Sequence, residues 1–168
     1  MNENCAWITK GRIMAIIGIV GGDSCKTAHL FLQMYQDKFK RVHRESYKIT
    51  VNEDISLVCI DENTTTEPNI WIIQEAIQNW HPSRESLLII NADSKPVPTY
   101  GKVLSYGFNS KASITASSVA DGTMQVCVQR GFTTLNGQLV EPQEFKIVCP
   151  HHAKAINVLG AVAACVLF

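Results

Sequence analysis

The sequence predicts an α/β protein with a mostly parallel sheet, a P-loop-type first strand–turn–helix unit, flanking helices, and an antiparallel strand-rich section near the C-terminus. Three observations predict this class. Apolar runs alternate with helical patterns in the first half of the chain. The first apolar run ends in two glycines and is soon followed by a Lys-Thr pair. From residue 102 onward, Thr/Ser/Val-rich segments alternate with turn dipeptides.

Composition limits the domain count and the partners. The chain has 168 residues, 46% hydrophobic and 18% charged, so we expect one domain over 1–168, with residues 1–10 as an N-terminal extension. Its 15 Lys and Arg residues balance 15 Asp and Glu residues, which argues against nucleic-acid and anionic-membrane partners. The first ten residues, Met1–Lys10, are polar and do not form a secretory signal, and the apolar run after them ends within about 10 residues, too few to span a bilayer. We therefore expect a cytoplasmic protein.

The six cysteines follow no C-x-x-C spacing. We interpret them as reduced thiols, most of them in the core, which again indicates the cytoplasm. Cys149 lies close to His151 and His152, so a zinc site is an alternative there. Tetrahedral zinc sites usually show paired ligands at short spacing, and the two histidines are better explained as surface residues at a helix start.

The first elements are a strand and a helix. Gly11–Val20 is almost continuously apolar, as expected for a central parallel strand. The spacing of apolar residues then predicts a helix from Lys26 to about Lys40. The basic run between Lys38 and Arg44 follows, and we interpret it as a solvated helix end, with a nucleic-acid contact as the alternative.

The middle of the chain predicts strands at Tyr47–Val51, Ile55–Ile60 and Ser86–Asn91. Between the last two, Ile70, Ile73 and Ile77 recur at helical spacing, which predicts a helix over Ile70–Trp80 that ends before Pro82. We expect Trp71 and Trp80 to be core or domain-contact residues.

The last third predicts four further strands and a helix. The strands are Lys102–Phe108, Ser113–Val119, Thr123–Phe132 and Gln138–Val148. Asp121-Gly122 and Asn136-Gly137 are strong tight-turn signals, so Thr123–Val148 is predicted to be a hairpin. A helix rich in small residues is expected from about His151.

The stretch that points to chemistry is the loop after the first strand, Gly22-Asp23-Ser24-Cys25-Lys26-Thr27. Backbone N–H groups and a helix N-terminus in such a loop bind phosphate, and the lysine adds a full positive charge. Two alternatives stay open. Lys26 and Thr27 can simply begin a helix capped by Asp23 or Ser24, and Cys25 can be a reactive thiol at a helix start.

The order of these features resembles the central, ATP-binding domain of the Mur ligases and their folylpolyglutamate synthase relatives. The family's G-x-x-G-K-T loop is matched by Gly22–Thr27 and its Asn-x-Asp-Asp strand end by Asn91–Ser94. The segment Tyr106–Asn109 is similar to a later family turn, and Asn157–Ala164 is similar to the family's last helix. The resemblance covers roughly residues 11–168.

The resemblance implies that Gly22–Thr27 and Asn157 bind ATP, with Mg²⁺ held by Thr27 and Glu62. Glu62 has an alternative interpretation as a solvated strand-end acid. The sequence also departs from the family pattern: Cys25 replaces a loop glycine, Ser94 replaces the second acid, and Gly160 stands where the family has an adenine-contacting asparagine.

We find no equivalent of the modified lysine that holds a second magnesium, and we expect neither the N-terminal substrate domain nor the C-terminal ligase domain within this chain. The sequence therefore favours a degenerate nucleotide-binding or non-catalytic module with a weakened ATP site. The alternative is an ATP-dependent amide ligase of cell-wall peptide synthesis, completed by a protein partner that supplies the missing domains. ATP and Mg²⁺ are the cofactors that the resemblance implies.

Overall fold

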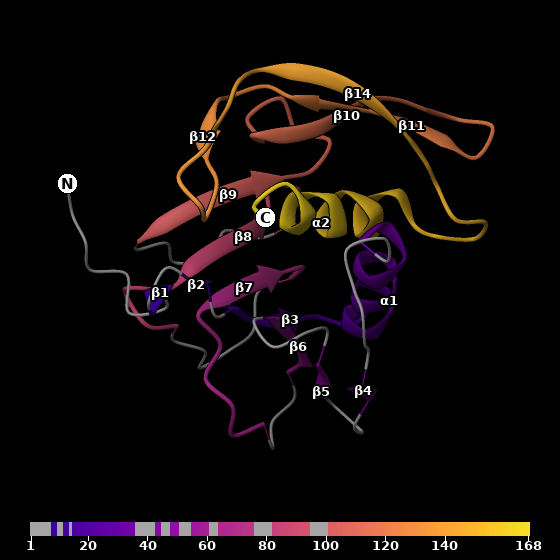
Figure 1. Ribbon diagram of the computed structural model, residues 1–168. Helices are drawn as coiled ribbons and strands as arrows, with labels where there is room; N and C mark the ends of the chain where they lie inside the picture. The colour runs from indigo at the N-terminus through magenta and orange to yellow at the C-terminus, as the bar shows by residue number, and fades with distance from the viewer. Residues whose placement is uncertain are drawn as a thin grey trace.

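The computed structural model describes residues 8–9, 12–13, 15–35, 43–44, 48–50, 55–60, 64–75, 82–94 and 101–168. Figure 1 shows the order of the helices and strands in these residues. The first half of the chain contains β1 (Ile8–Thr9), β2 (Arg12–Ile13), β3 (Ala15–Val20), α1 (Ser24–Tyr35), β4 (His43–Arg44), β5 (Lys48–Thr50), β6 (Ile55–Cys59), β7 (Ile70–Ile73) and β8 (Leu87–Asn91). The second half contains β9 (Lys102–Tyr106), β10 (Ile114–Ala120), β11 (Thr123–Val128), β12 (Phe132–Thr133), β13 (Leu139–Val140), β14 (Gln143–Val148) and α2 (Ala155–Cys165).

Ten of the described strands form one sheet, in the order β14-β11-β10-β9-β8-β7-β3-β6-β5-β4. Its centre, from β9 to β6, is parallel. β11 and β14 extend it antiparallel on one side, and β5 and β4 do so on the other. The predicted α/β class, with a mostly parallel sheet and an antiparallel section near the C-terminus, is confirmed.

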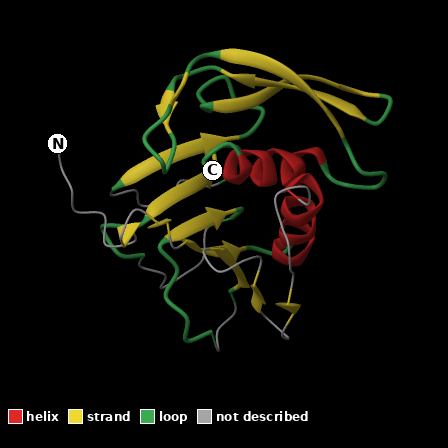
Figure 2. Ribbon diagram, viewed as in Figure 1, coloured by secondary structure: helices red, strands yellow, loops and turns green. Residues whose placement is uncertain are grey.

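Both helices lie on the same face of this sheet, where they pack against each other (Figure 2). The strands alternate their side chains between two apolar layers, as the pleat requires. In β7, Ile70 and Ile72 join the core beneath the helices, whereas Trp71 and Ile73 join a smaller cluster on the opposite face. The prediction that Trp71 is a core residue is confirmed, while Trp80 lies outside the described residues.

The opposite face is covered at β3 by the segment that precedes β7. Gly18 in the middle of β3 has no side chain, and Pro68 occupies the space where one would be. A Cβ atom at Gly18 would lie 2.4 Å from Cγ of Pro68. The glycine therefore allows this segment to lie directly on the central strand.

The predicted helix over Ile70–Trp80 is wrong at its start, because Ile70–Ile73 is the buried parallel strand β7. All four side chains are buried, so the run has no polar face. A short apolar run of this kind fits a strand covered on both faces as well as it fits one turn of a helix, and the β-branched residues favour the strand. Residues 76–81, including the second half of the predicted helix, lie outside the described residues.

Several predicted boundaries also change. The Gly11–Val20 strand divides into β2, which pairs antiparallel with β1, and β3, which lies at the sheet centre. α1 begins at Ser24 instead of Lys26, and its predicted end near Lys40 lies outside the described residues. His43–Arg44 forms β4, so this part of the basic run is not a helix end.

The turn and hairpin predictions are confirmed. Asp121 and Gly122 both have positive φ, 50° and 69°, and they join β10 to β11. β11 pairs with β14 from Thr123↔Val148 to Val128↔Gln143. Between these two strands, β12 and β13 form a small hairpin of their own around the Asn136-Gly137 turn.

The last helix, α2, begins at Ala155, later than the predicted His151. His152 adopts a left-handed φ of 69°, which a right-handed helix does not allow. His151 and His152 are exposed turn residues before the helix.

Candidate functional site

The carboxyl ends of β7, β8 and β9, the loop after β3 and the start of α2 surround a cavity of about 370 Å³. Ligands of open α/β sheets bind at this edge. The cavity is lined by Gly22, Asp23, Gln74, Glu75, Asn91, Tyr106, Lys154, Ile156 and Asn157. Three of the residues predicted to bind nucleotide, Gly22, Asp23 and Asn157, therefore share one cavity.

The loop from β3 to α1 is a tight turn that requires glycine. Gly21 has φ of 131°, and a Cβ there would lie 2.8 Å from Cβ of Gln74. Ser24 N–H donates to the Gly21 carbonyl at 3.1 Å, and the N–H groups of Lys26 and Thr27 donate to the Asp23 carbonyl. Asp23 thus holds the position before the helix, as predicted for a cap.

The Asp23 carboxylate, however, lies between two lysines. Its Oδ1 accepts a hydrogen bond from Lys26 Nζ at 2.9 Å, and its Oδ2 accepts one from Lys154 Nζ at 2.6 Å. Lys154 and Lys26, with a smaller contribution from Asn157, hold the pKa of Asp23 well below its usual range. The same carboxylate raises the pKa of Lys154. The predicted phosphate-binding lysine is therefore paired with an anion of its own chain.

A second carboxylate meets the backbone of the loop. Glu75 Oε1 accepts a hydrogen bond from Gly22 N–H at 2.6 Å. Phosphate loops work by aiming such backbone N–H groups at a bound anion. Here the loop N–H and the loop lysine each have a carboxylate of the protein in that role.

Thr27 and Asn157 take part in an interior hydrogen-bond network. Gln74 Nε2 donates to Thr27 Oγ1 at 2.7 Å and to Asn157 Oδ1 at 3.1 Å. Thr27 is fully buried, and Asn157 is 3% exposed. Asn91 Nδ2 donates to the main-chain carbonyl of Gln74. Gln74 therefore links the end of β7 to β8 and to both helices.

The predicted Mg²⁺ ligands are not brought together among the described residues. The Thr27 hydroxyl accepts the Gln74 amide in the interior, and Glu62 lies outside the described residues. Within the described ranges, no group of three or more His, Cys, Asp or Glu side chains is placed to hold a metal ion.

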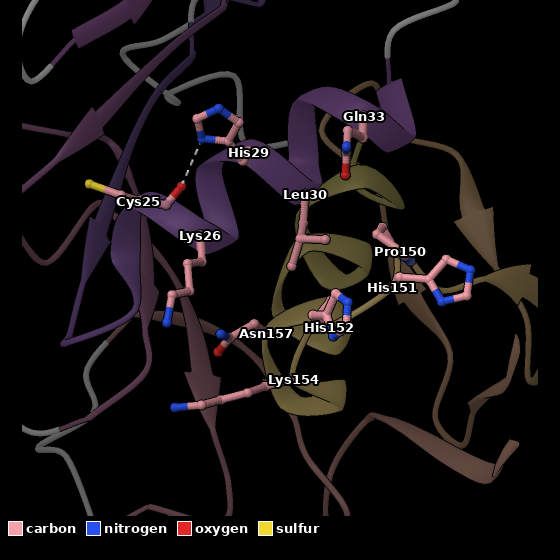
Figure 3. A pocket seen from close by; sticks show the side chains of 11 residues that line it. Cys25, Lys26, His29, Leu30, Gln33, Pro150, His151, His152, Lys154 and Asn157 are labelled. Carbon is pink, nitrogen blue, oxygen red and sulfur yellow. Dashed lines mark hydrogen bonds between the residues drawn. The ribbon is translucent and has the colours of Figure 1, made fainter. Parts of the chain in front are cut away.

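Cys25 does not fill the loop. Figure 3 shows its sulfur directed away from the side chains of Lys26 and Lys154. Its Sγ instead donates a hydrogen bond to Cys59 Sγ at 3.4 Å. Ser24, the remaining predicted loop residue, is half-buried as the first residue of α1.

A second cavity of about 330 Å³ lies beside the first, between α1 and the segment that leads into α2 (Figure 3). Lys26, Lys154 and Asn157 line it together with three histidines, His29, His151 and His152. No Asp or Glu side chain from the described part of the chain lines this cavity, and both lysines already pair with Asp23.

Two further motifs of the resemblance, Asn91–Ser94 and Tyr106–Asn109, lie in contact with each other. Asp93 accepts hydrogen bonds from the N–H groups of Phe108 at 2.6 Å and Asn109 at 2.8 Å. Asn91 Oδ1 accepts a hydrogen bond from Asp93 N–H at 3.0 Å, a turn bond at the end of the strand. Both side chains therefore organise the edge of the sheet.

Gly160 lies beneath the ring of Tyr106. A Cβ at Gly160 would lie 3.1 Å from Cζ of Tyr106, and Tyr106 itself is fully buried. A larger side chain at residue 160 would collide with the Tyr106 ring before it could contact a ligand. Burial, followed by the charge of Asp93, raises the pKa of Tyr106 above its usual value.

Sequence reasoning missed Gln74, Glu75 and Lys154. The first two fell within the predicted helix, although a strand over Ile70–Ile73 would have placed them at the carboxyl end of the sheet, like Asn91 and Asp93 after β8. No sequence signal distinguishes Lys154 from other lysines before a helix.

No protein-family model matches this sequence, and no curated protein matches it either. Among the described helices, none is long and apolar enough to cross a bilayer.

Proposed function

We propose that this chain is a non-catalytic, Mur-ligase-like central domain with a weakened ATP site, acting as a binding module. One observation supports this function over catalysis. The carboxylates of Asp23 and Glu75 take the donors that a phosphate loop presents to its ligand, namely the Lys26 ammonium and the Gly22 N–H.

The chemistry of phosphoryl transfer explains why these contacts matter. A ligase of this type needs the phosphates of ATP clamped by loop amides, lysine and magnesium. An incoming phosphate would have to displace both carboxylates and would then lie close to their negative charge. Like charges at short distance disfavour binding, so we expect weak affinity for ATP.

The cytoplasm is the proposed location. The described cysteines Cys25, Cys59, Cys127, Cys149 and Cys165 are all free thiols. Free thiols are typical of reducing compartments.

The second candidate is an ATP-dependent amide ligase of cell-wall peptide synthesis, completed by a partner chain. The position of the cavity favours it, because the loop, the start of α2 and the strand ends surround an open space at the edge where α/β proteins bind ligands. Lys26 is 69% exposed at its side chain and is therefore free to turn from Asp23 toward a phosphate.

Thermal unfolding with MgATP separates the two candidates. A site occupied at 100 times its dissociation constant stabilises a protein by about 2.7 kcal/mol, which for a chain of this size raises Tm by roughly 5–10 °C. For the non-catalytic module we expect no such rise at millimolar MgATP. The comparison variants are Lys26→Ala and, as a matched control, Lys146→Ala on the exposed strand β14.

A rise in Tm that survives Lys146→Ala and disappears in Lys26→Ala would refute the non-catalytic function and support the ligase. A rise that survives both variants would indicate a nucleotide site away from this loop, and it would count against both candidates, because both place the ATP site there.

A further inference from the structure

Two cysteines far apart in sequence touch in the folded protein. Cys25 is the second residue of α1, and Cys59 is the last residue of β6. Their sulfur atoms lie 3.4 Å apart, although the residues are 34 positions apart in the chain. The contact therefore joins the start of the loop helix to the carboxyl end of a sheet strand.

The backbone holds both residues in place. Cys59 pairs with Ile19 in the parallel ladder between β6 and β3, and the following N–H, of Ile60, donates to the Ile19 carbonyl at 2.9 Å. β3 then leads through the Gly21 turn directly into α1. The scaffold thus fixes the Cys25–Cys59 contact through ordered structure on both sides.

We propose that Cys25 and Cys59 form a redox-active dithiol, a modification site whose oxidant is a low-molecular-weight disulfide. The inference goes beyond the proposed binding function and does not depend on whether the loop binds a nucleotide.

The two thiols differ in access, which assigns their roles. Cys25 is exposed, so an external disulfide can reach it, whereas Cys59 is half-buried. Burial, followed by the hydrogen bond with Cys25, raises the pKa of Cys59 to about 12. Cys25 is therefore the attacking thiol and Cys59 the resolving thiol, since only the thiolate is a nucleophile.

The reaction proceeds in two exchanges. The Cys25 thiol loses its proton to solvent, and the thiolate attacks one sulfur of the external disulfide. The external S–S bond breaks, and the other sulfur leaves with the electron pair as a thiolate that takes up a proton from solvent. The Cys59 sulfur, deprotonated in turn, attacks Cys25 Sγ and expels the second external thiol. Overall the protein loses two electrons and two protons, and the external disulfide is reduced to two thiols.

The new bond would link two segments that are distant in sequence. Closing such a loop restricts the unfolded chain, so we expect the oxidised protein to melt about 5 °C or more above the reduced protein.

The experiment incubates the full chain in buffers of oxidised and reduced glutathione, blocks free thiols by alkylation, and maps the products by mass spectrometry. In the wild type we expect a Cys25–Cys59 disulfide as the main product. In Cys59→Ser the reaction should stop at glutathione bound to Cys25, because the resolving thiol is missing. Cys127→Ser, on β11, is the matched control and should still form the Cys25–Cys59 disulfide.

Two results would overturn the proposal. One is a wild-type protein that keeps both thiols free in a buffer that oxidises a reference dithiol peptide. The other is a wild type that accumulates glutathione on Cys25 to the same extent as Cys59→Ser. The first result comes from the wild-type chain alone, so it holds even if a variant fails to fold.

Discussion

The Asp23 carboxylate is bonded to two ammonium groups that come from opposite ends of the chain, Lys26 and Lys154. Its position before α1 would normally direct the side chain to the free N–H groups of the first turn. Here the lysines take both oxygen atoms. The negative charge of Asp23 thereby offsets part of the positive charge that the two lysines bring to the loop.

The charge of Asp23 should be visible in the pH dependence of stability. The pKa of Asp23 is lower in the folded protein than in the unfolded chain. The ionised carboxylate therefore stabilises the fold above the unfolded pKa of about 3.9, and this contribution is lost as pH falls through the lower, folded-state value. We expect the Tm difference between wild type and Asp23→Asn to be constant from about pH 7 to 5 and to shrink below about pH 4.

Asp121→Asn, on the exposed turn between β10 and β11, is the control for this measurement, since asparagine tolerates the positive φ at that position. We expect it to change Tm little. A difference between wild type and Asp23→Asn that grows toward low pH would contradict the assigned ion pairs.

Removing the carboxylates of Asp23 and Glu75 should increase the affinity of the loop for anions. If Asp23 and Glu75 act as internal competitors for anions, the double variant Asp23→Asn/Glu75→Gln exposes Lys26 and the Gly22 N–H to a ligand. Removing two like charges should raise the affinity for inorganic phosphate roughly tenfold or more, as measured by titration calorimetry. Adding Lys26→Ala should remove the gain. Equal affinity in wild type and double variant would show that the carboxylates do not compete.

At the scale of elements, β3 depends on the absence of a side chain at Gly18. A Cβ at this position would lie 2.4 Å from Cγ of Pro68 and 2.9 Å from its Cβ. The proline ring cannot rotate away as the end of a long side chain could. The segment before β7 can therefore stay on β3 only if residue 18 remains glycine.

Gly18→Ala should accordingly destabilise the protein by about 2–3 kcal/mol, in the upper range for overpacking, as measured by urea unfolding. The companion variant Pro68→Gly removes the clashing ring. The double variant should be less destabilised than the sum of the two single variants, because the contact that causes the cost is gone. Additive effects would mean that the clash is absorbed elsewhere.

At the scale of the whole molecule, the predictable parts are those whose sequence shows a regular spacing of apolar residues or a tight-turn dipeptide. The alternating strands of the C-terminal section and the Asp121-Gly122 turn were predictable, because strand alternation and left-handed turn residues are local properties. The central strand β3 was predictable from its unbroken apolar run.

The parts that could not be predicted depend on contacts between distant residues. The spacing of Ile70, Ile73 and Ile77 fits a helix, and the strand Ile70–Ile73 is fixed by its pairing with the neighbours β3 and β8. Asp23 pairs with Lys154 because of the way α2 packs, and Cys25 contacts Cys59 because of the position of β6. No local sequence pattern predicts either contact.

The ion pair between Asp23 and Lys154 also has a consequence for the order of folding. It joins residues 131 positions apart, so it can form only after α2 has docked on the sheet. During synthesis the first strand, the loop and α1 emerge long before Lys154 does. A growing chain therefore passes through a stage in which Lys26 is available to Asp23 but Lys154 is not. The second ion pair of Asp23 forms only when α2 packs on the sheet.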